Sequence, residues 1–410
     1  MNKDEQTVSR RDFLQAGAVA ASVVATTGSL AAMGEEKKEG EKKKEVQPMP
    51  RRKLGRSGME VTMLSQGASD TGDRYLNMMY EEGIRAIDSA DCYGMGKHER
   101  AVGEWLNKTG RRKEYCLVTK DHPHTPDQWV TMLDRRLKNG RQDYYDLYFI
   151  HALGIEEYPE TCVSWPAERE WAKIAEKIKK SGKARFVGFS SCCDPVERRT
   201  EVLNSAAKGG WVDAIMVAAD PSLIRDNAEF NKALDACHKA GIGLISMKEM
   251  RGQSNIKQVL PEFEARGLTP ATAVLTAMWS DERFAAICSH MDNIVKLKEN
   301  AAAARNFSPM TETETAAVHR MLDGHAKGYC VGCDGSCKRA AGTETAFNDI
   351  ARYLCYHDEN GDREGARRLF AALPPEARDW AKADLAAASK ACVSKLDFER
   401  ILARAAEKLA

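Results

Sequence analysis

Short apolar segments alternate with helix-patterned segments from Arg51 to about Phe307, and this alternation limits the fold more than any other feature of the chain. The segments between the apolar runs have the periodicity of amphipathic helices, as at Trp165–Lys180, Pro195–Ala207 and Ala228–Ala240. Eight strand–helix units in roughly 250 residues are typical of a (β/α)8 TIM barrel, so we predict an α/β fold of this type. The apolar runs predict strands at Val61–Gln66, Ile84–Asp88, Tyr115–Thr119, Asp146–Ile150, Ala184–Ser190, Asp213–Val217, Ile242–Met247 and Phe284–Ser289.

An open, doubly wound parallel sheet is the alternative fold. Such a sheet usually has a glycine-rich fingerprint after its first strand. Here Leu64–Asp70 contains a single glycine, Gly67, which favours the barrel. Ahead of the first strand, the alternation and the two glycines of Leu54–Val61 predict a small hairpin that closes the bottom of the barrel.

The first residues of the chain resemble an export signal. Arg10 and Arg11 form a twin-arginine sequence within Ser9–Leu14, and Gln15–Ala32 is mildly apolar and rich in small residues. We therefore predict a twin-arginine signal at 1–33, recognition by the twin-arginine translocation machinery, and a periplasmic or other extracytoplasmic location. A transmembrane helix is the alternative. The charged run within 34–50 predicts a disordered linker.

Charge and composition exclude some classes of partner. The chain has 61 Lys and Arg against 60 Asp and Glu, so nothing predicts a nucleic-acid partner. At 43% hydrophobic and 7% aromatic residues, the composition is that of a globular protein with a substantial core. We expect a barrel at 51–308 and a helical, cysteine-containing domain at 309–410.

Four side chains of catalytic types follow the predicted strands. Asp88, Lys120 and His151 lie at or just past three strand ends, and Tyr93 follows in a loop. The carboxyl ends of barrel strands meet at the face where active sites form, so we predict a proton-transfer site there. Each residue also has an ordinary interpretation: a helix cap, a packed ring, a solvated ammonium and a hydrogen-bonded imidazole.

The same residues lie in segments that resemble the aldo-keto reductases. This family implies an NAD(P)H-dependent reduction of a carbonyl, or the reverse oxidation, with Tyr93 as the general acid. The substrate implied is a small carbonyl compound or sugar. The resemblance rests on Gly83–Gly94 with Glu99 and Gly103, and on Leu54–Val61, Val118–Lys120, Asp146–His151 and Val187–Ser190.

Physical chemistry is consistent with these roles. A free phenol has a pKa of about 10, and the Lys120 ammonium should lower the pKa of Tyr93. Asp88 would hold that lysine, and His151 would donate a hydrogen bond to the substrate oxygen. A bound nicotinamide would supply the hydride.

The predicted nicotinamide site departs from the family pattern. Ser190 is kept after the fifth strand, but Ser191 replaces the usual Asn. The usual Gln and the stacking aromatic ring correspond to Met216 and Ala219. Fewer hydrogen bonds and the loss of the ring would weaken the orientation of the nicotinamide.

The sequence around the last predicted strand agrees better with the family pattern than the predicted nicotinamide site does. It assigns the adenosine phosphate to Ser289, Asn293, Lys296 and Asn300. Lys296 favours NADP(H) over NAD, because a 2′-phosphate needs a cation. Its ordinary interpretation is a solvated helix face. The pyrophosphate side would be lined by Met247, Lys248 and Met250.

The cysteines after the barrel predict a metal centre. Of twelve cysteines, Cys330, Cys333 and Cys337 form a Cys-x2-Cys-x3-Cys run, and Cys392 or Cys355 offers a fourth thiolate. A branch of the aldo-keto reductases has a ferredoxin-like C-terminal segment, which implies a 4Fe-4S cluster with Cys392 as the last ligand. Zinc and disulfides are the alternatives.

The C-terminal sequence around these cysteines is helix-patterned, and it predicts helices at 343–358, 362–373, 375–388 and 397–409. The hypothesis is an exported aldo-keto-reductase-like enzyme followed by an all-α cluster-binding domain, with a redox partner protein in addition to the substrate. The alternatives are an iron–sulfur electron-transfer protein with a degraded nicotinamide site, and a non-catalytic binding barrel with a structural metal.

Overall fold

The computed structural model describes residues 48–410 except 69, 156, 193–195, 251–255, 257–258, 327–329, 331–334, 359–362 and 393. The predicted signal, the linker up to residue 47 and Cys333 therefore lie outside the described residues.

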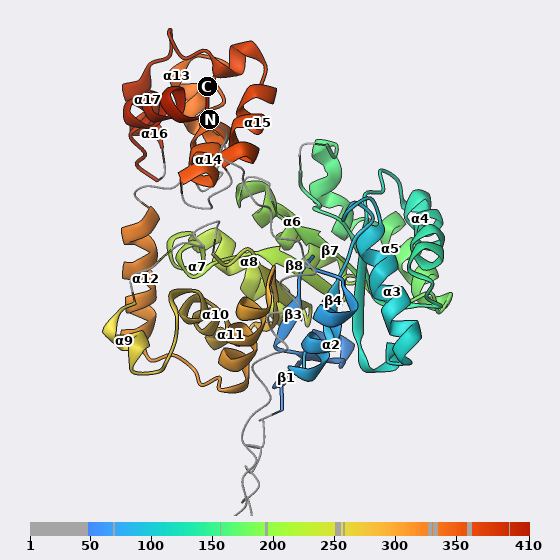
Figure 1. Ribbon diagram of the computed structural model, residues 1–410. Coiled ribbons are helices and arrows are strands. Elements are labelled where there is room, and N and C mark those ends of the chain that lie inside the picture. The colour runs from blue at the N-terminus through green and yellow to red at the C-terminus, as the bar shows by residue number, and fades with distance from the viewer. Residues whose placement is uncertain are drawn as a thin grey trace, which may run out of the picture. The chain divides into compact units, whose positions relative to one another are not determined.

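Eight parallel strands close into a barrel, with each strand hydrogen-bonded to the next in chain order and β10 to β3 (Figure 1). This confirms the predicted (β/α)8 architecture. Side chains alternate between the barrel interior, where Leu147 and Phe149 pack with Met216, and the layer beneath the helices, where Tyr148 packs. The strands are β3 Leu64–Gln66, β4 Ala86–Asp88, β5 Cys116–Asp121, β6 Tyr145–Ile150, β7 Ala184–Ser191, β8 Ala214–Ala218, β9 Gly243–Met247 and β10 Phe284–Ser289.

An antiparallel hairpin precedes the barrel, as predicted. Strands β1 (Arg51–Lys53) and β2 (Glu60–Thr62) pair around the short 3-10 helix η1 (Gly55–Ser57). The Arg56 guanidinium donates to the carbonyls that precede β8, and its amide donates to Gly241 ahead of β9 at 2.6 Å. The hairpin therefore lies at the amino ends of the strands. The predicted strand Val61–Gln66 is in fact two strands, β2 and β3, separated at Met63.

Helices surround the strands, and α3, α4 and α5 lie along one side of the barrel in Figure 1. The predicted helix Trp165–Lys180 is wrong at its start. Trp165 belongs to the 3-10 helix η3 (Glu160–Ala167), and α5 begins only after the extended residue Glu168. The helices to this point are α2 Asp73–Glu81, α3 Lys97–Thr109, α4 Pro126–Gly140, α5 Arg169–Lys180, α6 Val196–Gly209, α7 Pro221–Asp226, α8 Ala228–Lys239, α9 Pro261–Glu264, α10 Pro270–Ser280, α11 Ile294–Arg305 and α12 Glu312–Ala326, with the 3-10 helix η2 at Arg112–Glu114.

The remaining C-terminal helices have a core cluster of their own, built around Phe347, Phe370 and Phe398. The predicted helix 375–388 is wrong, because a 3-10 turn occupies its beginning and Asp384 starts a new helix by accepting the amide of Ala387. The elements are α13 Ser336–Ala341, α14 Phe347–Asp358, α15 Arg363–Ala372, η4 Pro375–Arg378, α16 Leu385–Ala391 and α17 Phe398–Lys408. Within the described part of the chain, no helix has both the length and the apolar character that a membrane span requires.

Candidate active site

A buried ion pair lies at the carboxyl ends of β4 and β5. The Lys120 ammonium contacts Asp88 and donates to the Ser89 carbonyl at 2.7 Å. The Tyr93 hydroxyl donates to the other carboxylate oxygen of Asp88 at 3.3 Å, and the Lys120 nitrogen lies 4.8 Å from the centre of the Tyr93 ring. Neither member of the ion pair is more than 3% exposed, so each depends on the other for compensation of its charge.

The electrostatics at Tyr93 differ from the prediction. Burial raises the pKa of Tyr93 above its usual value, and the Asp88 carboxylate raises it further. The predicted lowering by Lys120 is therefore wrong for the site as it stands, since the lysine charge is taken up by Asp88 and the Ser89 carbonyl. The phenol keeps its proton near neutral pH.

His151 completes the predicted set of four. Its backbone amide donates to the Asp121 carbonyl at 2.7 Å, which extends the pairing of β5 and β6 past the strand end. Its ring meets the Tyr93 ring edge to face, with centroids 5.7 Å apart. Burial lowers the pKa of His151 to about 4 despite the opposing Asp91, so the imidazole is neutral.

Sequence reasoning missed two further polar residues, Asp91 and His122. Asp91 accepts from His122 at 3.4 Å and lies 3.8 Å from His151. Burial alone would raise the pKa of Asp91, but the hydrogen bond with His122 and the nearby His151 ring bring it below its usual range. A signal was present: His122 directly follows β5, which continues two residues past the predicted end at Thr119.

A cavity of about 560 Å³ opens above these residues. This volume is within the roughly 300–1,000 Å³ typical of small-molecule sites. The cavity brings together six predicted residues, Tyr93, Lys120, His151, Ser190, Met247 and Lys248. Its other lining residues are Ala152, Ile155, Glu157 and Cys192.

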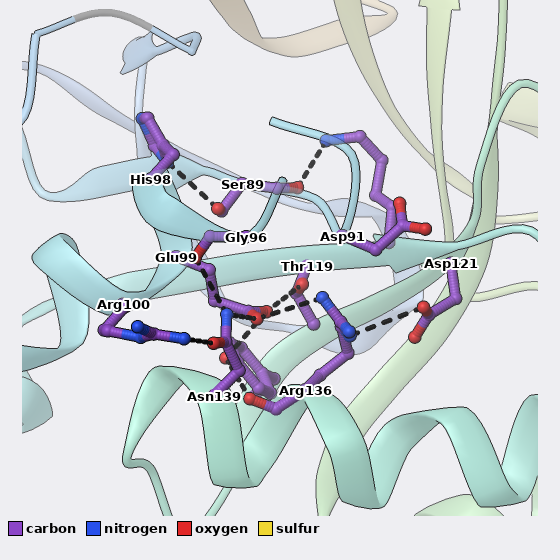
Figure 2. A network of polar contacts seen from close by, with 12 residues as sticks. Ser89, Asp91, Gly96, His98, Glu99, Arg100, Thr119, Asp121, Arg136 and Asn139 are labelled. Carbon is purple, nitrogen blue, oxygen red and sulfur yellow. Dashed lines mark hydrogen bonds and ion pairs between the residues drawn. The ribbon is translucent and has the colours of Figure 1, made fainter. Parts of the chain in front are cut away.

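A buried polar network supports the site from behind (Figure 2). Glu99 of α3 accepts from Thr119 at 2.6 Å and from Asn139 at 2.8 Å, and it pairs with Arg136. Arg136 also reaches Asp121 at 3.4 Å. Burial raises the pKa of Asp121 to about 7, although Arg136 opposes this shift. The network thereby holds β5, which carries Lys120, against α3 and α4.

The residues predicted for the nicotinamide site lie at the end of β7 and inside the barrel. The Ser190 hydroxyl accepts the Ala152 amide at 2.8 Å, and the Ser191 hydroxyl donates to the Leu153 carbonyl at 2.9 Å. Met216 packs in the barrel interior, and Met250 packs beside α9 and α12, so the structure does not bring either to the cavity. Lys248 lines the cavity in a left-handed backbone conformation.

The residues predicted for the adenosine phosphate lie together at β10 and the start of α11. Asn293 caps α11 by accepting the Lys296 amide at 3.0 Å, and Asn300 donates to the Ser289 hydroxyl at 3.1 Å. The Lys296 ammonium pairs with Asp292 at 2.8 Å on a half-exposed surface. A 2′-phosphate would therefore compete with Asp292 for this cation.

Three of the four predicted metal-binding cysteines can be followed in the structure. Cys337 and Cys392 are buried, and Cys330 packs partly buried against the same apolar cluster. Cys337 lies in α13, Cys392 directly follows α16, and α13 packs on α16. Cys333 lies outside the described residues.

Comparison with known proteins identifies the barrel. The model of the aldo/keto reductase family matches residues 64–305. The chain is 27% identical to the NADP(+) aldo-keto reductase yakc of Schizosaccharomyces pombe over 218 residues, 48% of this chain and 60% of that protein. It is 32% identical to glyoxal reductase of Bacillus subtilis over 187 residues, 45% of this chain and 60% of the relative. The chain thus spans about three fifths of these two relatives.

A third relative and two solved structures match over more of their length. The aldo-keto reductase str7 of Strobilurus tenacellus is 24% identical over 328 residues, which are 67% of this chain and 93% of the relative. A holo aldo-keto reductase of Bacillus halodurans matches 67% of this chain and 96% of its own at 21% identity, with a TM-score of 0.53. An aldo-keto reductase of Klebsiella pneumoniae in complex with NADPH matches 68% of this chain and 95% of its own at 20% identity, with a TM-score of 0.53. The chain belongs to the aldo/keto reductase family.

Proposed function

We propose that this enzyme reduces a small carbonyl compound with NADPH, and that Tyr93 donates the proton. The observation that carries the proposal is that Tyr93, Lys120 and His151 line one cavity of about 560 Å³, with Asp88 in contact with both Lys120 and the Tyr93 hydroxyl. When bound, the nicotinamide would supply the hydride. Ser190 and Lys248 would hold the cofactor on the cavity side, and Asn293 and Lys296 on the adenosine side.

The resting Tyr93 phenol is neutral and therefore carries the proton that an alkoxide oxygen would take, although its raised pKa makes it a weaker acid than a free phenol. The Lys120 ammonium beneath the ring stabilises the phenolate that remains after transfer. The neutral His151 ring borders the same space and can orient the carbonyl oxygen.

The test is the substitution Tyr93→Phe, with Tyr144→Phe as the matched control. Tyr144 lies just ahead of β6, at the opposite end of the barrel, and loses the same hydroxyl. Loss of a general acid typically lowers turnover about 10²–10⁴-fold, so Tyr93→Phe should do this without abolishing NADPH binding, measured by fluorescence. A wild-type protein that binds neither NADPH nor NADH would contradict the proposal.

We further propose export by the twin-arginine route, on the basis of Arg10 and Arg11. Replacing both with Lys keeps the charge and should leave the protein in the cytoplasm, whereas replacing Lys37 and Lys38 with Arg should not. Equal periplasmic fractions of the two variants would contradict this proposal.

The C-terminal cysteines support a 4Fe-4S cluster held by Cys330, Cys333, Cys337 and Cys392. Thiolates are the ligands that such clusters need, and three of these cysteines belong to one apolar cluster of side chains. When bound, the cluster would carry single electrons to or from a redox partner protein.

A second candidate function is electron transfer with a degraded nicotinamide site. It is favoured by one observation: Ser191 donates to a backbone carbonyl, and Met216 and Ala219 are buried apolar residues at the positions where the family resemblance expects an amide and a stacking ring. Cluster reduction without NADPH binding would support this alternative.

A further inference from the structure

We infer that Asp91, His122 and His151 form a binding site for one divalent transition-metal ion, with zinc the first expectation. The three residues follow three successive strands, β4, β5 and β6, and each offers one ligand atom. These atoms, a carboxylate oxygen and two imidazole nitrogens, all lie within 4.8 Å of one another. Two histidines and one carboxylate are a common ligand set for zinc and for non-haem iron.

The separations between these atoms fit a tetrahedral ion. Nitrogen and oxygen ligands bonded to zinc at about 2.0–2.2 Å lie about 3.3–3.6 Å from one another. Here the His122 Nδ1 atom is 3.4 Å from one Asp91 oxygen, and the His151 Nδ1 atom is 3.8 Å from the other. The Cys92 sulfur lies 3.6 Å from the same nitrogen of His151, but it does not belong to the group of three ligand atoms. Binding one ion through a single Asp91 oxygen therefore needs side-chain movements that bring separations of at most 4.8 Å into this range.

The backbone holds the three ligands in place. The Asp91 amide donates to the Lys120 carbonyl at 3.1 Å, and the His151 amide donates to the Asp121 carbonyl at 2.7 Å. The imidazoles of His122 and His151 also pack against each other, with centroids 4.6 Å apart. A site on fixed strand ends loses little freedom when an ion binds.

The nearest ammonium group does not neutralise the Asp91 carboxylate, so this carboxylate can bind a cation. The Lys120 ammonium is taken up by Asp88 and the Ser89 carbonyl. One oxygen of Asp91 is buried and accepts no hydrogen bond from the described residues.

An ion at this site would change which hydrogen bond the His151 ring can make in the cavity. The importance of this change for catalysis rests on the proposed function. Without an ion, the Asp91 carboxylate favours the tautomer with its proton on Nδ1, and in that tautomer the other ring nitrogen can only accept. With an ion on Nδ1, the neutral ring must carry its proton on Nε2, which can then donate to a carbonyl oxygen. The metal would thus set His151 as a donor.

The experiment treats the full-length protein with a chelator and then titrates it with Co²⁺. Calorimetry and visible absorption measure the binding. His122→Gln and Asp91→Asn remove ligands. His124→Gln is the matched control, because the His124 ring lies near the site at a tilt to the Tyr158 ring but is not among the three ligands. The C-terminal cysteines are unchanged in all variants, so their contribution cancels.

We expect the wild type and His124→Gln to bind one more equivalent of Co²⁺ than either ligand variant, or to bind it at least about tenfold more tightly. Equal stoichiometry and affinity in all four proteins would overturn the inference and leave a His–Asp–His hydrogen-bond cluster. Thermal unfolding without metal checks that the variants are folded. Tyr93→Phe should keep the extra equivalent, so failure of the reductase proposal and failure of this one can be told apart.

Discussion

Tyr93, Lys120 and Asp88 show how one buried ion pair shapes a reactive group at the level of the residue. The ammonium does not touch the phenol oxygen, because Asp88 lies between the two and contacts both. In this arrangement the resting phenol is kept neutral by burial, and the cation beneath its ring acts on the phenolate only once it forms. Removing either member of the pair would leave a buried charge uncompensated.

Glu249 gives a pH dependence of stability that is independent of catalysis. It is 4% exposed, and the Ser246 hydroxyl donates to its carboxyl group at 2.6 Å. Burial raises the pKa of Glu249 from 4.5 to about 7, and nearby Asp220 adds to the shift. Between these two values the folded state binds more protons than the unfolded state, so stability should fall as the pH rises.

The linked loss is on the order of 3 kcal/mol between about pH 5 and pH 8. Urea unfolding of the wild type and of Glu249→Gln at both pH values measures it. The variant keeps a neutral hydrogen-bonding side chain, so its two free energies of unfolding should differ by about 3 kcal/mol less than those of the wild type. An unchanged difference would mean that Glu249 does not carry this pH dependence.

At the residue level, the sequence predicted site residues where the predicted end of the preceding strand was close to the observed one. It missed a site residue where the strand continues past its predicted end. Asp88, Lys120 and His151 could be grouped because barrel strand ends converge. His122 was missed because the strand was ended at Thr119, whereas pairing with β6 continues to Asp121. Position in sequence also could not show that Asp88 would separate Lys120 from the Tyr93 hydroxyl.

At the level of elements, helices α3 and α4 illustrate a contact that composition alone does not reveal. Gly103 lies inside α3, where glycine is normally unfavourable. A Cβ atom on Gly103 would lie 1.8 Å from the Gly140 carbonyl oxygen at the end of α4, and a backbone atom cannot turn aside. The two helices therefore approach as closely as they do because this position has no side chain.

Gly103→Ala should consequently destabilise the protein, although the same change in an open helix stabilises by roughly 0.5–1 kcal/mol. We expect a loss of about 1–3 kcal/mol from overpacking, measured by urea unfolding. Glu104→Ala on the exposed face of α3 is the control and should change stability by less than about 1 kcal/mol. A stabilised Gly103→Ala variant would show that α3 and α4 can separate freely.

Local structure also explains which of the predicted strands and helices agree with the structure. Apolar strands were located within a few residues, because burial on both faces gives an unmistakable run. Helix starts were less predictable where a local hydrogen bond decides them. Asp384 caps α16 and divides what the pattern indicated as one helix, and the turn η3 takes Trp165 and Pro166 out of α5.

At the level of the whole molecule, the described chain has core clusters for the barrel and a separate one for the C-terminal helices. The second cluster contains Cys337 and Cys392 among its buried residues. Thiols in such a position act as small apolar side chains unless a metal draws them together. A bound cluster would add folding free energy to this small group of helices.

The proposal of a 4Fe-4S cluster leads to a direct comparison of two cysteines. Wild-type protein purified without oxygen should be brown and contain iron and sulfide, because thiolate-bound clusters absorb visible light. Cys392→Ser should lose most of both, since it removes a proposed ligand. Cys355→Ser, which replaces a half-buried cysteine of α14 outside the proposed set, should keep them. If Cys355→Ser loses the iron and Cys392→Ser keeps it, Cys355 is the fourth ligand in place of Cys392. A colourless, zinc-containing wild type would exclude the cluster.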